Sequence, residues 1–358
     1  MLIDGGPPDT WPTLRARLER LDDPYIDVAA VTHIDSDHIG GFLPFVRSPF
    51  AHQVGDFWFN ARPHLPGGLD GTRSIPQGES LATELSALAP PEKPATPDTV
   101  QGETLAGRDS GASASTDEDC GAPLPWNVAF GGGPIESGEA GGFREVPISG
   151  APRITVLSPT TKRLQILGAK WHEAVSEGRR GEEGETDTAD VPPPLGDLVA
   201  MANETSPRDA SAPNGSSIAL LVEHRGASAL LSGDAFGNVL GAALAGLAKA
   251  RGAAAIELGA LKLPHHGSRG NVLRAMLKLA PARHYIVSTN GDTFHHPDDA
   301  AIARTVLAGA ESPTISFNYR TPRAERWNAP ELRAQYGFAV RFPGDPTPGI
   351  AVELEEHP

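Results

Sequence analysis

The segment from Thr32 to Gly41, THIDSDHIGG, constrains the fold and chemistry of this chain more than any other feature. It places four potential metal ligands within six residues, between an apolar stretch ending at Val31 and a predicted helix. Two imidazoles and two carboxylates on one short turn are costly to desolvate together unless a cation compensates them. Loops at strand ends are where α/β folds place their sites. A mixed nitrogen and oxygen set suits Zn²⁺ or Mn²⁺.

The candidate ligands of this segment are His33, Asp35, Asp37 and His38. Taken singly, each is compatible with an ordinary solvated polar loop. Three further polar clusters follow later apolar strands, and they contain Asp234, the pair His265 and His266, and His296. Because every cluster begins where an apolar strand stops, the sequence predicts that they contribute to one metal site.

In combination, these motifs resemble the metallo-β-lactamase fold, whose usual signature is His-x-His-x-Asp-His and which appears here with Asp35 at the third position. LLSGDA and LKLPHHGS are similar to motifs of the soluble hydrolase domain of the competence protein ComEC and its stand-alone relatives, as are LIDGG and His296-Pro297. The resemblance covers about residues 1 to 60 and 150 to 320. It implies one α/β domain over residues 1–358, a four-layer αββα sandwich. The usual family has a hairpin before LIDGG, so we expect a truncated N-terminal hairpin.

The resemblance also implies a cofactor, two divalent ions, Zn²⁺ or Mn²⁺, with a shared water that becomes the attacking hydroxide. By similarity, His33 and Asp35 hold one metal, Asp37 and His38 hold the second, Asp234 bridges them, and His265 completes the set. Asp37 is expected to orient the nucleophile. The remaining polar residues, expected to contact substrate or protonate the leaving group, are His266, Ser268 and His296.

Two further residues are assigned to substrate binding. Lys262 lies before the HHGS segment, where an ammonium group could meet a phosphate. Asn214 occupies the neighbourhood of the family's third-motif histidine, which this chain lacks, and is either a weak oxygen ligand or a residue of an Asn-Gly turn.

The chain has 40 glycines and 34 prolines among 358 residues, an excess over ordinary globular composition. Much of the excess falls in two tracts rich in Gly, Pro and acidic residues, at 89–145 and 176–213, which we interpret as loop or disordered insertions within the domain. Two windows, 101–145 and 176–210, each carry a net charge of −6, while the whole chain carries −15. The rest of the chain is therefore close to neutral.

These observations favour a metal-dependent phosphodiesterase or nuclease acting on accessible DNA or another phosphoester. The acidic chain and the absence of an evident basic and aromatic groove count against a nucleic-acid substrate, although bound metals would supply positive potential. The alternatives are hydrolysis of a small ester, lactone, thioester or lactam, and a regulatory protein with a degenerate site. The acidic insertions are candidates for binding a protein partner.

Cys120 is the single cysteine, so the chain cannot form an intramolecular disulfide, and a reducing compartment fits best. No apolar run is long enough for a membrane span, and Met1 to Asp4 lack a signal-peptide pattern. We therefore expect a cytoplasmic protein without membrane insertion.

Overall fold

The computed structural model describes residues 1–22, 24–65, 76–87, 124–148, 152–181, 192–292, 294–344 and 349–354. Within them, two sheets form the centre of the molecule. The smaller sheet has three parallel strands in the order β1 (Leu2–Ile3), β2 (Ala29–Ala30) and β3 (Phe57–Trp58). The larger sheet runs from β11 to β4 in reverse chain order. Its strands are β4 (Arg144–Val146), β5 (Arg153–Ser158), β6 (Ala219–His224), β7 (Ala227–Leu231), β8 (Leu258–Lys262), β9 (Ala282–Val287), β10 (Thr314–Phe317) and β11 (Ala339–Arg341).

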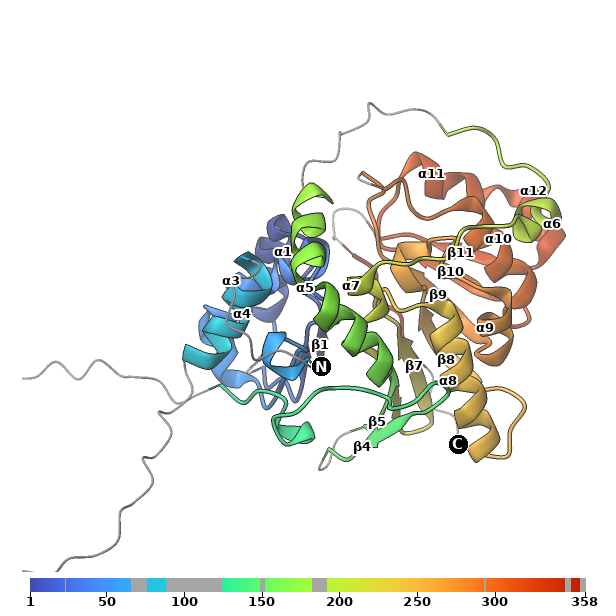
Figure 1. Cartoon of the computed structure of the whole chain (residues 1–358). Coiled ribbons are helices and arrows are strands. Elements are labelled where there is room, and N and C mark those ends of the chain that lie inside the picture. The colour runs from blue at the N-terminus through green and yellow to red at the C-terminus, as the bar shows by residue number, and fades with distance from the viewer. Residues whose placement is uncertain are drawn as a thin grey trace, which may run out of the picture.

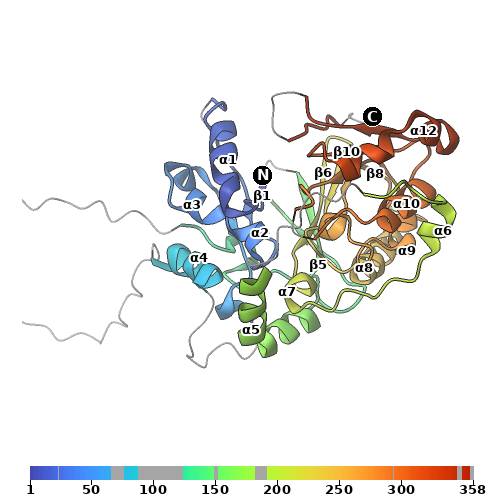
Figure 2. The same cartoon turned by 90° about the horizontal axis from the view of Figure 1, so that it is seen from above.

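Helices cover both outer sides of the paired sheets (Figure 1). One group consists of α1 (Trp11–Leu18), α2 (Ser36–Ile39), α3 (Phe42–Val46), α4 (Pro76–Ala87) and α5 (Thr161–Gly181). The opposite side carries α8 (Gly237–Ala250), α9 (Arg274–Leu279) and α10 (Asp299–Ala308), and the view from above separates the same two groups (Figure 2). The remaining short helices are α6 (Leu198–Asn203), α7 (Ala212–Gly215), α11 (Pro322–Glu325) and α12 (Pro330–Tyr336).

Three apolar cores separate these layers, and the alternation of side chains along the strands explains them. In the smaller sheet, Ala29 and Val31 pack toward the helices α1 to α5, whereas Val28 and Ala30 pack toward the larger sheet. The larger sheet alternates in the same way along β6. Leu220 belongs to the core between the sheets, and Leu221 belongs to the core under α8 to α10. The predicted α/β class and the four-layer αββα arrangement are confirmed.

The direction of the strands brings the predicted polar clusters to one edge. β7, β8 and β9 are parallel neighbours, so their carboxyl ends lie on the same side of the larger sheet. The loop after β2 meets this edge, because the Ile218 amide before β6 donates to the Thr32 carbonyl oxygen at 2.9 Å. Loops from both sheets therefore meet at the carboxyl ends of β7, β8 and β9.

Two glycines allow the first loop to pack against the ligand-bearing turn. The amide of Gly5 donates to the His38 carbonyl, and the amide of Gly41 donates to the Gly6 carbonyl, both at 2.8 Å. A Cβ atom on Gly41 would lie 2.2 Å from the Gly5 carbonyl oxygen, closer than any real Cβ contact. Gly5 and Gly41 are thus explained by close backbone contact.

The structure describes the last part of each predicted insertion as packed. In residues 124–148, Phe130 and Ile135 join the core between the sheets, and the buried Asn127 side chain bonds the backbone of Phe59. In residues 192–213, Leu198 of α6 lies in the core under α8 to α10. These stretches contain enough apolar anchors to belong to the domain, whereas residues 89–123 and 182–191 lie outside the described residues.

Cys120 also lies outside the described residues. No helix in the described parts of the chain is long and apolar enough to cross a bilayer.

Arg304 of α10 holds three parts of the chain together from a buried position. Its side chain, in a residue 5% exposed, donates to the carbonyl oxygens of Arg269 and Val272 at 2.7 and 3.1 Å. It also donates to the carbonyl oxygens of Ala202 and Glu204, at 3.1 and 2.7 Å. One guanidinium therefore fixes α6 and the chain after it to the loop that follows the two site histidines.

We expect Arg304→Ala to lower the free energy of unfolding by at least about 3 kcal/mol, because several buried carbonyl oxygens would lose their donors at about 1–3 kcal/mol each. Urea unfolding at neutral pH measures the change. The control is Arg15→Ala, which removes an exposed arginine paired with Glu19 and should change stability by less than about 1 kcal/mol. A similar effect in both variants would contradict the role of Arg304.

Candidate metal centre

The first half of the site is the turn between β2 and α2. Asp35 is the N-cap residue of α2, with extended φ and ψ of −70° and 144°, and its carbonyl oxygen accepts from the amides of His38 and Ile39. This sharp entry into the helix puts His33 before the turn and His38 after it, with their ring centroids 4.1 Å apart. Both histidines are 2% exposed.

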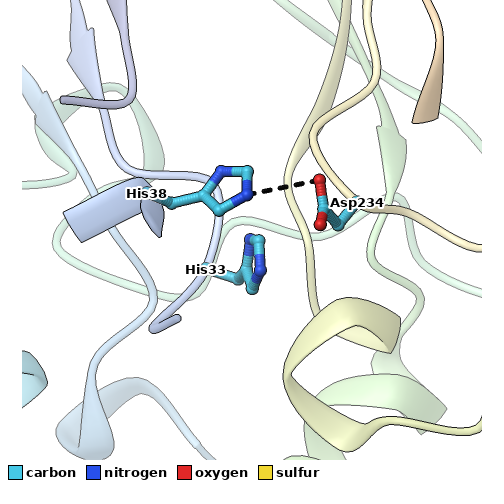
Figure 3. A group of neighbouring side chains, drawn as sticks. All are labelled: His33, His38 and Asp234. Atoms are coloured by element: carbon cyan, nitrogen blue, oxygen red, sulfur yellow. Dashed lines mark ion pairs between the residues drawn. The ribbon is translucent and has the colours of Figure 1, made fainter. Parts of the chain in front are cut away.

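The second half of the site is Asp234, which follows β7. Gly233 before it has φ +51°, and a Cβ atom there would lie 2.9 Å from Cβ of Thr32, so glycine is needed where the two loops touch. The Asp234 amide bonds Oγ of Ser217 at 3.0 Å. Asp234 is 2% exposed, and its carboxylate faces the histidines of the first half (Figure 3).

Two groups of potential ligands share this space. One consists of His33, His38 and Asp234, and the other of Asp37, His38 and His266; within each group the ligand atoms lie within 4.8 Å of one another. His38 Nε2 is 3.3 Å from Oδ1 of Asp234 and 3.2 Å from Nε2 of His266. His266 Nε2 is 3.0 Å from Oδ2 of Asp37 and 3.5 Å from Oδ2 of Asp234. Asp234 therefore lies against both groups.

Two buried atoms of this cluster, Nε2 of His33 and Oδ1 of Asp234, make no well-formed hydrogen bond to the described residues. Their nearest charged neighbours are Oδ2 of Asp35 and Nε2 of His38, each at 3.3 Å. The other ring nitrogen of His33 is 3.0 Å from Oγ of Ser217, which leaves Nε2 facing the cluster. Buried polar atoms are almost always satisfied, so such exceptions need an explanation. A divalent cation bound by nitrogen and carboxylate oxygen would supply the missing partner for both atoms. The residues present thus fit a metal.

Opposite charges dominate the electrostatics of the cluster. Burial opposes ionisation of Asp234, but His38 and His266 outweigh it and hold the pKa of Asp234 well below its usual value. Burial likewise opposes a charge on His38, yet Asp234, Asp4 and Asp37 raise the pKa of His38 well above its usual value. The pKa of Asp37 is lowered because His38 and His266 outweigh its burial. The carboxylates are therefore ionised at neutral pH.

Asp4 orients His38 from the N-terminal segment. Its Oδ2 atom lies 2.8 Å from Nδ1 of His38, and Oδ1 accepts from the Thr32 amide at 2.7 Å. With Nδ1 engaged by Asp4, the other nitrogen of His38 points at Asp234 and His266. A carboxylate behind a histidine fixes ring orientation and raises its basicity in metal sites. The sequence signal for Asp4 is its place in LIDGG, but sequence reasoning gave it no role.

The positions of the two histidines of the PHHG segment differ from the roles that the sequence assigned to them. That assignment gave His265 to the metal and His266 to substrate, whereas in the structure it is His266 that joins Asp37 and His38. The residues lie in the 3₁₀ turn Pro264–Gly267, and both have positive φ, 49° and 53°, so the adjacent rings have different environments. Nδ1 of His266 bonds the Ser288 carbonyl at 2.6 Å, and Nδ1 of His265 bonds Asp209 at 3.1 Å.

Asp35 and His296 lie at the margins of the cluster. Oδ2 of Asp35 is 3.3 Å from Nε2 of His33, but Asp35 is in neither three-residue group. The ring of His296 is 5.3 Å from that of His265, and burial lowers the pKa of His296 to about 4. His296 thus lies beside His265, and no hydrogen bond or ion pair among the described residues joins it to Asp234 or Asp37.

The three residues assigned to substrate binding make internal contacts. Asn214 lies in the single helical turn α7, and its side-chain amide nitrogen donates to Asp209 at 2.8 Å. Lys262 donates to the Gly233 carbonyl at 3.4 Å, next to Asp234. Oγ of Ser268 accepts from the Gly270 amide at 3.3 Å. Lys262 thus contacts the residue before Asp234, and the Ser268 amide donates to the carbonyl oxygen of His265, the residue before His266, at 2.7 Å.

These layers and this cluster define the class of the protein. Two sheets between helical layers, with histidine and aspartate ligands gathered at one edge from loops of both sheets, form a metallo-β-lactamase fold with a candidate metal centre.

Comparison with known families agrees with this class. Residues 1–111 match the model of the metallo-beta-lactamase superfamily, and the match includes the segment from His33 to His38. Members of that superfamily are mostly hydrolases that bind divalent metals, so the match and the ligand groups together support a metal-dependent hydrolase. No curated protein matches the chain.

We expect Asp4→Ala to weaken metal binding by about 10–100-fold, because His38 would lose the carboxylate that orients it. Titration of metal-free protein with Zn²⁺ against a competing chelator measures this. The control is Asp9→Ala, which changes another aspartate of the N-terminal segment, near the start of α1, and should leave the affinity unchanged. Equal affinity in wild type and Asp4→Ala would show that Asp4 does not support the centre.

Proposed function

We propose that this protein is a phosphodiesterase or nuclease that uses two divalent metal ions, Zn²⁺ or Mn²⁺. The observation that carries the proposal is the position of the buried Asp234 carboxylate against both ligand groups, one containing His33 and the other containing Asp37 and His266. A carboxylate shared in this way is suited to bridge two cations. The likeness of the LLSGDA and LKLPHHGS segments to the ComEC hydrolase domain supports the choice of a phosphodiester.

Each residue of the site would have a distinct role in hydrolysis. His33, His38, Asp234 and His266 would hold the metals, with Asp37 completing the set and orienting the water nucleophile. Bound metals would supply Lewis-acid stabilisation of the charge that develops on the phosphoryl oxygens. Lys262, next to Gly233, is placed to add positive charge near the substrate. His265, whose Nε2 atom lies 3.7 Å from Oδ2 of Asp234, would support metal binding there. His296, whose ring lies beside that of His265, would contact the leaving group.

The proposed substrate is accessible DNA or a small phosphoester. The overall charge of −15 opposes a polyanion in general, but much of that charge falls in the acidic tracts rather than in the loops that form the site. The ammonium and imidazole groups of the site, together with bound metals, would give the substrate a local positive potential. The acidic tracts remain candidates for binding a protein partner, and a cytoplasmic location remains a prediction from the sequence.

The substrate class is decided by one panel. Purified protein with Mn²⁺ or Zn²⁺ is incubated separately with labelled single-stranded DNA, bis-p-nitrophenyl phosphate, and a chromogenic lactam or lactone. We expect cleavage of the two phosphodiesters. Cleavage of the carbonyl substrates alone would contradict a nuclease and support hydrolysis of a small ester, lactone, thioester or lactam.

We expect Asp37→Ala and His266→Ala each to reduce phosphodiester hydrolysis by at least about 100-fold, because each removes a residue of the Asp37, His38 and His266 group. Initial rates on bis-p-nitrophenyl phosphate at saturating metal measure the loss. His52→Ala, which changes an exposed histidine outside the cluster, is the matched control and should keep full activity. Full activity in either site variant would defeat the assignment.

Chelation separates an enzyme from a regulatory protein with a degenerate site. If the centre binds metal, removing it should lower the melting temperature, since ligand binding to the native state stabilises it by mass action. Circular dichroism before and after dialysis against a chelator measures the shift. An unchanged melting temperature, with no metal in the purified protein, would favour the degenerate site.

A further inference from the structure

Asp209 is the centre of a buried hydrogen-bond network beside the metal cluster. It lies between α6 and α7, and its side chain is 11% exposed. Oδ2 lies 3.1 Å from Nδ1 of His265 and accepts from the amide nitrogens of Asn214 and Asn271, at 2.8 and 3.0 Å. Oδ1 accepts from the Ser211 amide at 2.9 Å. The donors around this carboxylate come from two separate parts of the chain, the start of α7 and the segment from His265 to Asn271.

Nδ1 of His265 faces Asp209 at 3.1 Å and Oδ1 of Asn271 at 3.2 Å, and these contacts set the direction of the ring. With Nδ1 directed to Asp209, the opposite nitrogen, Nε2, faces Asp234 and lies 3.7 Å from its Oδ2 atom. On another side, the His265 ring contacts the ring of His296, with 5.3 Å between the two centroids. His265 therefore presents one nitrogen to the carboxylate that both ligand groups share.

The network also reaches Asp234 through the backbone. The amide nitrogen of Asn271 that donates to Asp209 lies 3.1 Å from the Asp234 carbonyl oxygen. Asn271 is fully buried, and Arg304 fixes the chain on both sides of this contact by bonding the carbonyl oxygens of Glu204 and Val272. The position of Asp209 relative to Asp234 is thus determined by packing.

We infer that Asp209 is a positioning residue of the metal centre, which holds Nδ1 of His265 so that Nε2 faces Asp234 and supports metal binding there. The inference rests on the proposed metal centre, but it does not depend on which substrate is hydrolysed. A carboxylate that bonds the far nitrogen of a metal-facing histidine improves metal affinity by about 10–100-fold. Asp4 has the same relation to His38, so two carboxylates from distant segments would orient two histidines that face Asp234.

The test is Co²⁺ binding to metal-free protein, followed by the visible absorption of the bound ion. We expect Asp209→Ala to lower Co²⁺ affinity by about 10–100-fold and to change the absorption spectrum. Asp209→Asn keeps an oxygen acceptor for His265 and should recover part of the affinity. The control is Asp197→Ala in the same segment, because Asp197 only caps α6 by accepting from the Ala200 amide, and it should bind as wild type does.

A double-mutant cycle shows whether Asp209 acts through His265. If it does, Asp209→Ala should cost no further Co²⁺ affinity when His265→Ala is already present. Independent, additive losses would overturn the inference, as would wild-type affinity in Asp209→Ala. Should Asp209→Ala fail to fold by circular dichroism, the same cycle is measured with Asp209→Asn.

These results are separable from the proposed function. Wild-type protein that binds Co²⁺ but cleaves no phosphodiester would contradict the proposed function, while the cycle would still decide the role of Asp209. Wild-type protein that binds no Co²⁺ would overturn both.

Discussion

The burial of the Asp234 carboxylate is the constraint on which the arrangement of the site depends. An ionised carboxylate taken out of water costs several kcal/mol unless charges and hydrogen-bond donors replace the lost solvation. At Asp234 the compensation comes from the imidazoles of His38, His266 and His265, whose nitrogen atoms lie 3.3 to 3.7 Å from its oxygens. No one of these histidines could be removed without leaving the carboxylate less compensated. The loops that carry them are therefore held in a fixed relation to Asp234.

The imidazoles are in turn fixed by residues that never contact Asp234 through a side chain. Asp4 engages His38, the Ser288 carbonyl engages His266, and Asp209 engages His265. Each histidine thus has one nitrogen toward the centre and one toward a fixed acceptor. The orientation of the histidines is therefore fixed by the packing around the site. That packing includes the close backbone contacts of Gly5 and Gly41 and the buried guanidinium of Arg304.

Local motifs in the sequence were sufficient to predict the class of the fold and to single out the candidate ligands of the first turn and Asp234. His33, Asp37 and His38 share one turn, and Asp234 follows an apolar strand, so adjacency and periodicity reveal them. Adjacency could not decide between His265 and His266, because their separation depends on two successive residues with positive φ.

Asp209 gave no local signal at all, since it lies at the end of an acidic tract whose composition resembles a solvated linker. Its role becomes visible only once folding brings it to His265. The buried position of Arg304 could not be predicted from the sequence for a related reason. Arginine in a helix is usually a surface residue, and only the packing of α6 against α10 makes it buried.

Because the ligands come from loops of both sheets, the centre is a junction as well as a site. His33 and His38 follow a strand of the smaller sheet, while Asp234 and His266 follow strands of the larger one. Any cation held by both sets would act as a cross-link between the two halves of the sandwich. The occupied state would then resist separation of the sheets, and fluctuations that open the interface between them would also release the ion. Metal retention would report on the integrity of the whole β-sandwich.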